Sequence, residues 1–272
     1  MNARRSVWDR LIQLVRPRLV SGFAPPPIQI APELWSLERR LRMPGGPSLP
    51  TRTTVIRLRS EALLIVSPPP VEAGGLECLD ALGSVEEVLV PNSFHYLNTP
   101  GFLVRYPHAA LRVVPGLHER VPGFPNGQEL PELAPPSWHD EIEHLILGPV
   151  RGVSEAVLFH RPSATLILTD LAFHMLQFEN RLEQTVWRLN GVPPGFGPSR
   201  TSRLFLLSDR AAAGTFLDRV LTWPFQRVLV AHGEPLETNA TDVFRRAFAR
   251  YLTQPETAHR TAADDRSPRT RR

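Results

Sequence analysis

The chain has 272 residues, 42% of them hydrophobic, which is enough to bury the core of one large domain or two small ones. A charged fraction of 21% is ordinary for a folded protein and too low for a disordered one. All 31 basic residues are arginine, and the net charge is only +4. Because much of the excess charge lies at the two ends, and no basic stripe interleaved with aromatic residues crosses the body, the sequence carries no specific nucleic-acid signal.

The compartment is constrained by what the sequence lacks. The single cysteine, Cys78, cannot form an internal disulfide, which agrees with a reducing cytosol. No apolar run approaches the ~18 residues that a membrane-spanning helix needs. Residues 1–20 lack the continuous apolar segment of a secretion signal. We therefore expect a cytoplasmic protein without a transmembrane segment.

The two ends of the chain differ in composition from the middle. Apolar residues recur at helical spacing over residues 8–15, among arginines, which predicts a short basic amphipathic helix that ends at Pro17. We expect residues 1–30 to form a basic N-terminal arm that docks on the protein's own core or makes peripheral contact with an anionic membrane. A disordered basic tail is expected over residues 253–272, so that residues 31–252 form the folded domain.

The folded part opens with elements that are typical of a sheet. Two β-branched, apolar runs at residues 53–58 and 62–66 are joined by a short link and predict a hairpin. A short helix is expected over residues 76–82. Residues 87–90 and 111–114 are apolar runs bounded by proline, and they predict buried strands.

A second set of strands follows a proline-rich segment. Residues 115–137 contain six prolines and show no periodicity, which predicts a long surface loop. Short apolar strands are then expected at residues 142–147, 155–159 and 165–169, separated by turn signals.

Further helices and one more strand are predicted in the C-terminal part of the chain. Residues 210–222 form a helix that Ser208 or Asp209 can cap, a strand covers residues 227–231, and Thr241 caps a helix through residue 252. A further helix is expected earlier, over residues 176–189. Its apolar face consists of Leu176, Leu182, Val186 and Leu189. Apolar strands covered by amphipathic helices indicate a layered α/β architecture, in which sites gather on loops beyond the strands.

Several short segments match a known pattern in order. They lie at residues 34–39, 54–58, 67–68, 91–95, 159–163, 165–171 and 231–233. Their order resembles that of the metallo-β-lactamase fold, in which a hairpin precedes a histidine-bearing loop, a strand followed by aspartate, and a strand followed by His-Gly. More narrowly, the chain is similar to a bacterial and plant domain-of-unknown-function family, number 4336, grouped near that superfamily. The resemblance implies a four-layer αββα sandwich.

The resemblance also implies a metal motif, which this chain carries only in part. The superfamily holds two zinc or iron ions with an H-x-H-x-D-H motif, a later histidine, a bridging aspartate and a final histidine. The first motif falls on residues 92–97, where Asn92, Phe94, Tyr96 and Leu97 are poor ligands. No histidine lies at residues 148–154, where the later one is expected. Asp170 matches the bridging aspartate and His232 the last histidine, so the motif is incomplete.

The retained residues suggest a site for a single ion instead of two. A one-residue shift of the first loop would bring His95 to the site, and His95, Asp170 and His232 could then hold one zinc or iron ion with water in the fourth position. Asp170 and His232 are the catalytic candidates for hydrolysis of an ester, thioester or phosphoester in an unknown small molecule. Other candidates for the pocket are Asn92, Tyr96, Glu155, His160 and His174.

Other interpretations stay open. Asp170 and His232 could bond each other and the loop backbone, with a purely structural role. The protein could also be a metal-free, non-catalytic binding or scaffold protein in which Phe94 and Tyr96 fill the space that ions occupy in relatives. The sequence offers no support for a serine hydrolase, because Ser67, Ser93 and Ser163 lack a G-x-S-x-G setting.

Overall fold

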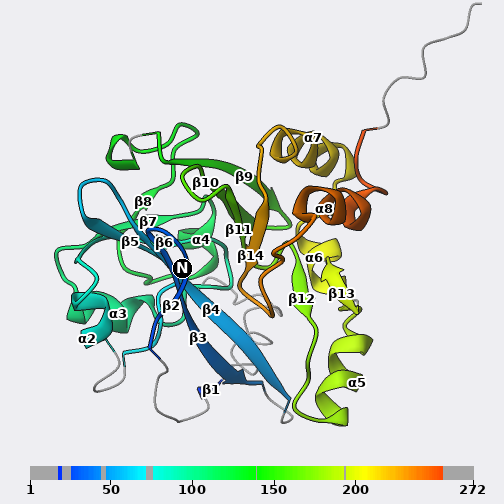
Figure 1. Cartoon of the computed structure of the whole chain (residues 1–272), viewed down its shortest axis with the longest axis horizontal. Coiled ribbons are helices and arrows are strands. Elements are labelled where there is room, and N and C mark those ends of the chain that lie inside the picture. The colour runs from blue at the N-terminus through cyan, green and yellow to red at the C-terminus, as the bar shows by residue number, and fades with distance from the viewer. Residues whose placement is uncertain are drawn as a thin grey trace, which may run out of the picture.

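The computed structural model describes residues 18–19, 26–43, 47–71, 76–138, 140–192 and 194–253. The amphipathic helix expected over residues 8–15 and the predicted tail beyond residue 253 lie outside the described residues. Two β-sheets pack face to face, and helices cover the outer face of each (Figure 1). The predicted four-layer αββα sandwich is confirmed.

The first sheet combines an antiparallel meander with a parallel half. Its strands run in the order β1-β3-β4-β5-β6-β7-β8, with β2 added beside β3. Pairing is antiparallel from β3 to β5 and parallel from β5 to β8, and the predicted hairpin is confirmed by the β4–β5 pair. The strands are β1 (Arg18–Leu19), β2 (Ile28–Ala31), β3 (Leu34–Arg42), β4 (Ser48–Arg57), β5 (Ala62–Val66), β6 (Ser84–Val90), β7 (Ala110–Val113) and β8 (Gln128–Glu129). Strand β2 begins at Ile28, inside the segment expected to be an arm.

The second sheet has the order β14-β11-β10-β9, with β11 and β14 parallel and the other pairs antiparallel. Its strands are β9 (Ile142–Val150), β10 (Val153–His160), β11 (Thr165–Leu168) and β14 (Arg227–Val230), each close to the apolar run that predicted it. A small ribbon of β12 (Phe173–Met175) and β13 (Gly195–Gly197) lies beyond it. No local sequence pattern predicts this ribbon, because both strands have only three residues.

Three apolar clusters hold the layers together. Between the sheets, Leu34 and Leu64 of the first sheet pack with Leu158 and Ile167 of the second. The outer face of the first sheet is covered by α2 (Glu77–Asp80), α3 (Thr99–Arg105) and α4 (Leu117–Arg120). The second sheet is covered by α6 (Arg200–Phe205), α7 (Arg210–Val220) and α8 (Ala240–Phe248), as Figure 1 shows. Strands buried on both faces explain why their sequences are continuous apolar runs.

The prediction of a surface loop over residues 115–137 is wrong in part. The segment contains α4 and β8 and runs into a 3₁₀ turn at Pro136–Trp138. Trp138 is fully buried, and its indole nitrogen donates to the carboxylate of Glu87 at 3.0 Å. Buried side chains therefore pin the segment to the first sheet, although its prolines prevent any helical or strand periodicity.

Helix α5 (Arg181–Leu189) is shorter than the sequence predicts, and its predicted apolar face is wrong. Leu182 and Leu189 are exposed, and so is Leu176 before the helix, while Glu183 and Trp187 are buried. The cause is a pair of hydrogen bonds between this helix and Ser48, the first residue of β4. The backbone N–H of Ser48 donates to Glu183 at 3.0 Å, and the Trp187 indole donates to the carbonyl of Ser48 at 2.9 Å. A buried carboxylate with these partners decides which face turns inward.

The two predicted caps near the C-terminus have different outcomes. Asp209 caps α7, because its side chain accepts a hydrogen bond from the backbone of Ala212. The prediction that Thr241 caps the last helix is wrong. The N-cap of α8 is Asn239, in a left-handed conformation, and the Thr241 hydroxyl donates instead to the carbonyl of Phe225 at 2.7 Å.

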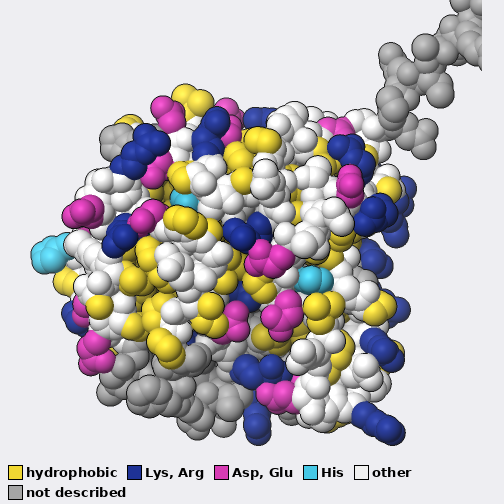
Figure 2. Space-filling model, viewed as in Figure 1, with side chains coloured by type: hydrophobic (Ala, Val, Ile, Leu, Met, Phe, Trp, Pro, Cys, Tyr) yellow, Lys and Arg dark blue, Asp and Glu magenta, His cyan; other side chains and the backbone are white. Residues whose placement is uncertain are grey.

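The surface carries arginines without a single dense stripe. In the space-filling view, arginine side chains lie along the side of the molecule formed by the helices from α5 to α8, interspersed with apolar and uncharged groups (Figure 2). Exposed examples on three of these helices are Arg181, Arg210 and Arg245. Within the described ranges, none of the helices has the length and apolar character needed to cross a membrane.

A candidate metal site where the two sheets meet

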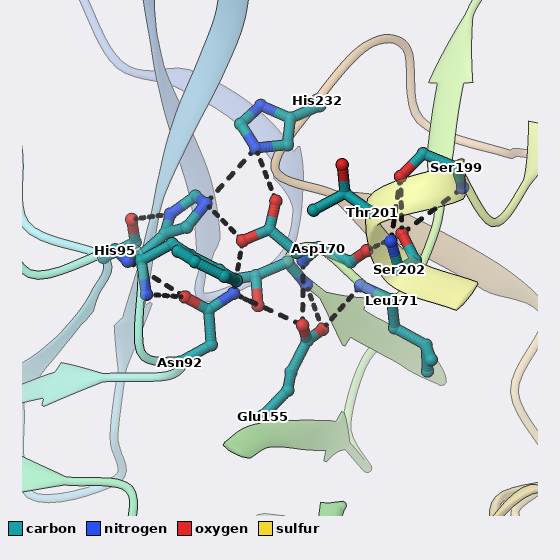
Figure 3. A network of polar contacts seen from close by, with 12 residues as sticks. Asn92, His95, Glu155, Asp170, Leu171, Ser199, Thr201, Ser202 and His232 are labelled. Atoms are coloured by element: carbon teal, nitrogen blue, oxygen red, sulfur yellow. Dashed lines mark hydrogen bonds and ion pairs between the residues drawn. The ribbon is translucent and has the colours of Figure 1, made fainter. Parts of the chain in front are cut away.

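Three polar side chains from separate parts of the chain converge at one end of the sandwich (Figure 3). Asp170 and His232 each lie two residues beyond a strand, and because β11 and β14 pair in parallel with Leu168 opposite Val230, both leave the sheet side by side. His95 comes from the loop after β6, in the other sheet. Parallel pairing within one sheet and packing of the two sheets thus bring the three residues together.

The atoms that face one another have the spacing of ligands around one ion. Nε2 of His95 lies 3.2 Å from Nε2 of His232 and 3.4 Å from Oδ2 of Asp170, and Nε2 of His232 lies 3.2 Å from Oδ1 of Asp170. Two atoms that are each about 2.1 Å from a tetrahedral ion lie about 3.4 Å apart. In neutral imidazoles these nitrogens can each offer a lone pair, so a cation or shared protons must lie between the three groups.

Each histidine has an outer partner on its second nitrogen. Nδ1 of His232 lies 2.8 Å from the carbonyl oxygen of Pro50, and because a carbonyl only accepts, Nδ1 carries the proton. Nε2 of a neutral His232 is then free to bind a cation, which is the usual arrangement of metal-ligating histidines. Nδ1 of His95 lies 2.6 Å from the hydroxyl of Ser67. The ring of Phe173 stacks on that of His232 at 4.9 Å and shields it from water.

Asn92, which the resemblance to the metallo-β-lactamase superfamily aligns with the first histidine of its motif, organises the loop. Its amide nitrogen lies 2.5 Å from Oδ2 of Asp170 and 2.9 Å from the hydroxyl of Thr169. Its amide oxygen accepts from the backbone N–H groups of Phe94 and His95 at 2.8 and 2.9 Å. One buried amide therefore fixes the backbone that carries His95 and orients the carboxylate of Asp170 (Figure 3).

Glu155 holds the other side of the Asp170 loop. Its fully buried carboxylate accepts hydrogen bonds from the backbone N–H groups of Thr169, Asp170 and Leu171 at 2.9, 2.9 and 3.1 Å. Burial, together with the nearby charge of Asp170, raises the pKa of Glu155 to about 7. Glu155 thus supports the backbone of the Asp170 loop, and its hydrogen bonds come from that backbone and from the amide of Asn92 (Figure 3).

The pKa of Asp170 is shifted in the opposite direction to that of Glu155. Burial by itself would raise its pKa, but when the imidazole nitrogens that face it carry protons, the charge of His95 and hydrogen bonds from His232 and His95 hold that pKa well below its usual range. A bound cation would take the place of those protons. Asp170 is therefore ionised at any working pH. An ionised carboxylate beside two imidazoles is a donor set that suits zinc and iron.

The glycine after His232 is required by the neighbouring ribbon. The backbone N–H of His174 donates to the carbonyl of His232 at 3.0 Å, and Glu234 donates back to the carbonyl of His174 at 2.8 Å. Gly233 has φ of +105°, and a Cβ there would overlap the carbonyl oxygen of His174. The His-Gly pair thus lets strand β12 approach closely enough to fix the backbone of His232.

Other candidates from the sequence lie elsewhere. The ring of Tyr96 packs edge-on against Phe124, in the core that covers the first sheet. His160 lies at the opposite end of β10 from Glu155, with Nδ1 2.7 Å from the hydroxyl of Ser163. Nδ1 of His174 lies 2.8 Å from the carbonyl of Glu234. Among the described residues, only His95, Asp170 and His232 form a group that could hold a metal ion.

Ser67 has no role that the sequence predicts, although residues 67–68 are among the segments that carry the resemblance. Nothing local distinguishes this serine, because its partner lies 28 positions further along the chain. Its place directly after β5, followed by proline, was the one usable signal. Pro50 could not be found from the sequence at all, since it contributes only a carbonyl group.

Solved structures resemble this sandwich. The metal-soaked Flv1 flavodiiron core from Synechocystis sp. PCC6803 matches with a TM-score of 0.57 and 12% identity over 87% of this chain, which spans 61% of the length of that protein. A metallo-β-lactamase from Pontibacter korlensis matches with a TM-score of 0.56 and 12% identity, covering 79% of this chain and 94% of that one. The FIM-1 metallo-β-lactamase from Pseudomonas aeruginosa, in its mono-zinc form, matches with a TM-score of 0.53 and 8% identity, over 84% and 97%.

These likenesses define the class: the protein has a metallo-β-lactamase-like fold. At such low identity they show the fold alone. The sequence profile of a family described as a domain of unknown function, DUF4336, matches residues 32–193. The chain therefore belongs to this family. A comparison with curated proteins finds no match.

Proposed function

We propose that the protein is a metal-dependent hydrolase that holds one zinc or iron ion with His95, Asp170 and His232 and cleaves an ester, thioester or phosphoester. The observation that carries this proposal is the convergence of three ligand atoms, 3.2–3.4 Å apart, from three distant stretches of chain. An ion bound there would lower the pKa of a water molecule and polarise a carbonyl or phosphoryl oxygen of the substrate.

The residues around the cluster suit this role. Asp170 is held ionised and is oriented by Asn92, so its oxygens need not rearrange to meet a cation. The side chains of His95, Asp170 and His232 are only 8%, 15% and 4% exposed, and Asp170 is the most accessible of the three. A nearly closed site excludes bulk water and strengthens its electrostatic interactions, which favours a small reacting group.

The scaffold alternative loses its main support. It required aromatic rings in the space between the former ligands, but Phe94 packs edge-on against Phe205 at a centroid distance of 6.1 Å, and Tyr96 against Phe124 at 5.9 Å. These rings belong to the two outer cores on opposite sides of the sandwich. A purely structural pair of Asp170 and His232 would also not require the ring of His95 beside them.

Metal analysis tests the proposal directly. Protein purified without chelator, or loaded with zinc or iron and then desalted, should carry about one ion per chain, and His232→Ala should carry almost none. His108→Ala is the matched control, because His108 is exposed and precedes β7, which runs parallel to β6, whereas His95 follows the opposite end of β6. Less than about a tenth of an equivalent in the wild-type protein would refute the metal site.

Hydrolysis is tested with the same proteins. Nitrophenyl esters, an acyl thioester and a nitrophenyl phosphodiester cover the three proposed bond types. Activity toward one of them should require the ion and should be lost in His232→Ala but kept in His108→Ala. One full equivalent of metal with no hydrolysis of any of the three substrates would contradict the enzymatic part of the proposal while leaving the metal site in place.

A further inference from the structure

Ser67 is placed on the outer side of the His95 ring by a rigid backbone. It follows β5 directly, its backbone N–H donates to the carbonyl of Leu89 at 3.0 Å, and its own carbonyl accepts from the hydroxyl of Thr53 at 2.6 Å. Ser67 is buried, with 8% of the residue exposed, and its hydroxyl lies 2.6 Å from Nδ1 of His95. Neighbouring strands on both sides therefore fix the position of the hydroxyl.

The backbone at Ser67 is in the left-handed region, with φ of +59°. Glycine adopts this conformation without strain, whereas a serine there is strained by its Cβ. Strained residues persist where the surrounding structure holds them in place, and they gather at functional sites. Since glycine would fit this backbone better, the presence of serine at position 67 is explained by its hydroxyl group rather than by the turn.

The hydroxyl has one partner of functional interest, the His95 ring. The carbonyl oxygen of Pro50 can only accept, so it fixes His232 in one tautomer. The hydroxyl of Ser67 can both donate and accept, and it is placed to accept a hydrogen bond from Nδ1–H of His95. We propose that Ser67 is a positioning residue, which holds the proton of the His95 imidazole on Nδ1 so that Nε2 presents its lone pair to the cation. This inference rests on the proposed metal site and names a residue that acts through a ligand.

The strain at Ser67 makes a sharp test possible, because one substitution should separate stability from metal binding. In Ser67→Gly the backbone relaxes while the hydroxyl disappears. Loss of a side chain that orients a ligand typically weakens metal affinity by about 10–100-fold. We expect the zinc dissociation constant of Ser67→Gly and of Ser67→Ala to rise by about this factor, while the melting temperature of metal-free Ser67→Gly stays at or above that of the wild type.

Glu61→Gly is the matched control. Glu61 has φ of +67° in the hairpin at the other end of β5, and it is exposed, so the same substitution relieves similar strain without touching the cluster. Its zinc affinity should equal that of the wild type. Nitrogen-15 spectra of the zinc-loaded wild type should show His95 protonated on Nδ1, with that proton lost or exchanging rapidly in Ser67→Gly.

The outcomes are distinguishable. Unchanged zinc affinity in Ser67→Gly would overturn the role of Ser67 while leaving the metal site intact. A fall in affinity that accompanies a fall in melting temperature would also overturn it, because the hydroxyl would then serve the fold. Wild-type protein that binds no zinc or iron would remove the proposed function and this inference together. Weaker binding with retained stability, and with normal binding in Glu61→Gly, supports the inference.

Discussion

Buried His160 should make the protein less stable in mild acid, by an amount that follows from its surroundings. The residue is fully buried, its Nδ1 bonds to Ser163, and its Nε2 has no hydrogen-bond partner among the described residues. Burial lowers the pKa of His160 to about 4, against 6.5 for the free side chain, although the charge of Glu33 opposes this shift.

The sign and size of the effect follow from proton linkage. Below pH 6.5 the unfolded chain binds a proton at this histidine, whereas the folded protein does not until the pH approaches 4. The stability contributed by neutral His160 is therefore complete above about pH 6.5 and falls as the pH decreases through this window. At 1.36 kcal/mol per pKa unit, the loss between pH 7 and pH 5 amounts to about 2 kcal/mol.

The assay compares free energies of unfolding from urea titrations at pH 7 and pH 5. The wild type should lose about 2 kcal/mol more than His160→Gln over this interval. His108→Gln, which removes an exposed histidine, should behave as the wild type does. The other buried groups remain in all three proteins, so their contributions cancel. An equal pH dependence in the wild type and in His160→Gln would refute the reasoning.

Two further substitutions test the local structure by urea unfolding. Gly233→Ala should lower the free energy of unfolding by at least about 3 kcal/mol, because a Cβ there overlaps the His174 backbone. Gly123 also has a positive φ but has open space around it, so Gly123→Ala should lower the free energy of unfolding by only about 1 kcal/mol. Similar losses at the two sites would contradict this prediction. Asp209→Ala removes the cap of α7 and should lower the free energy of unfolding by about 1 kcal/mol. Asp242 is exposed, and Asp242→Ala should lower it by less than about 0.5 kcal/mol. Equal losses in the two variants would disprove the role of the cap.

Local sequence patterns predict most strands here because their signal is short-range. Runs such as residues 62–66 and 155–159 are apolar and β-branched since both faces of the strand are buried, and turns bound them on either side. The cap of α7 is likewise readable, because Asp209 and Ala212 are three residues apart. The buried face of helix α5 could not be predicted from local sequence. Its orientation depends on Ser48, which lies 135 positions before Glu183.

Part of the candidate site can likewise be predicted from local sequence, and part depends on the fold. The sequence alone places Asp170 and His232 directly after apolar runs that predict strands, and its resemblance to the metallo-β-lactamase superfamily implies that Asn92, Phe94 and Tyr96 stand at positions of that superfamily's metal ligands. It also singles out His95 as a neighbour of that motif. These are statements about residue type and local position, which a linear pattern can carry.

Only the tertiary structure decides that the three side chains meet. Convergence requires β11 to pair in parallel with β14 and the two sheets to pack so that the loop after β6 lies opposite them. The roles of Glu155, Ser67 and Pro50 depend on the same long-range packing, because each contacts a residue that is distant in sequence. Contacts of this kind arise when distant surfaces are buried together, and no local pattern encodes them.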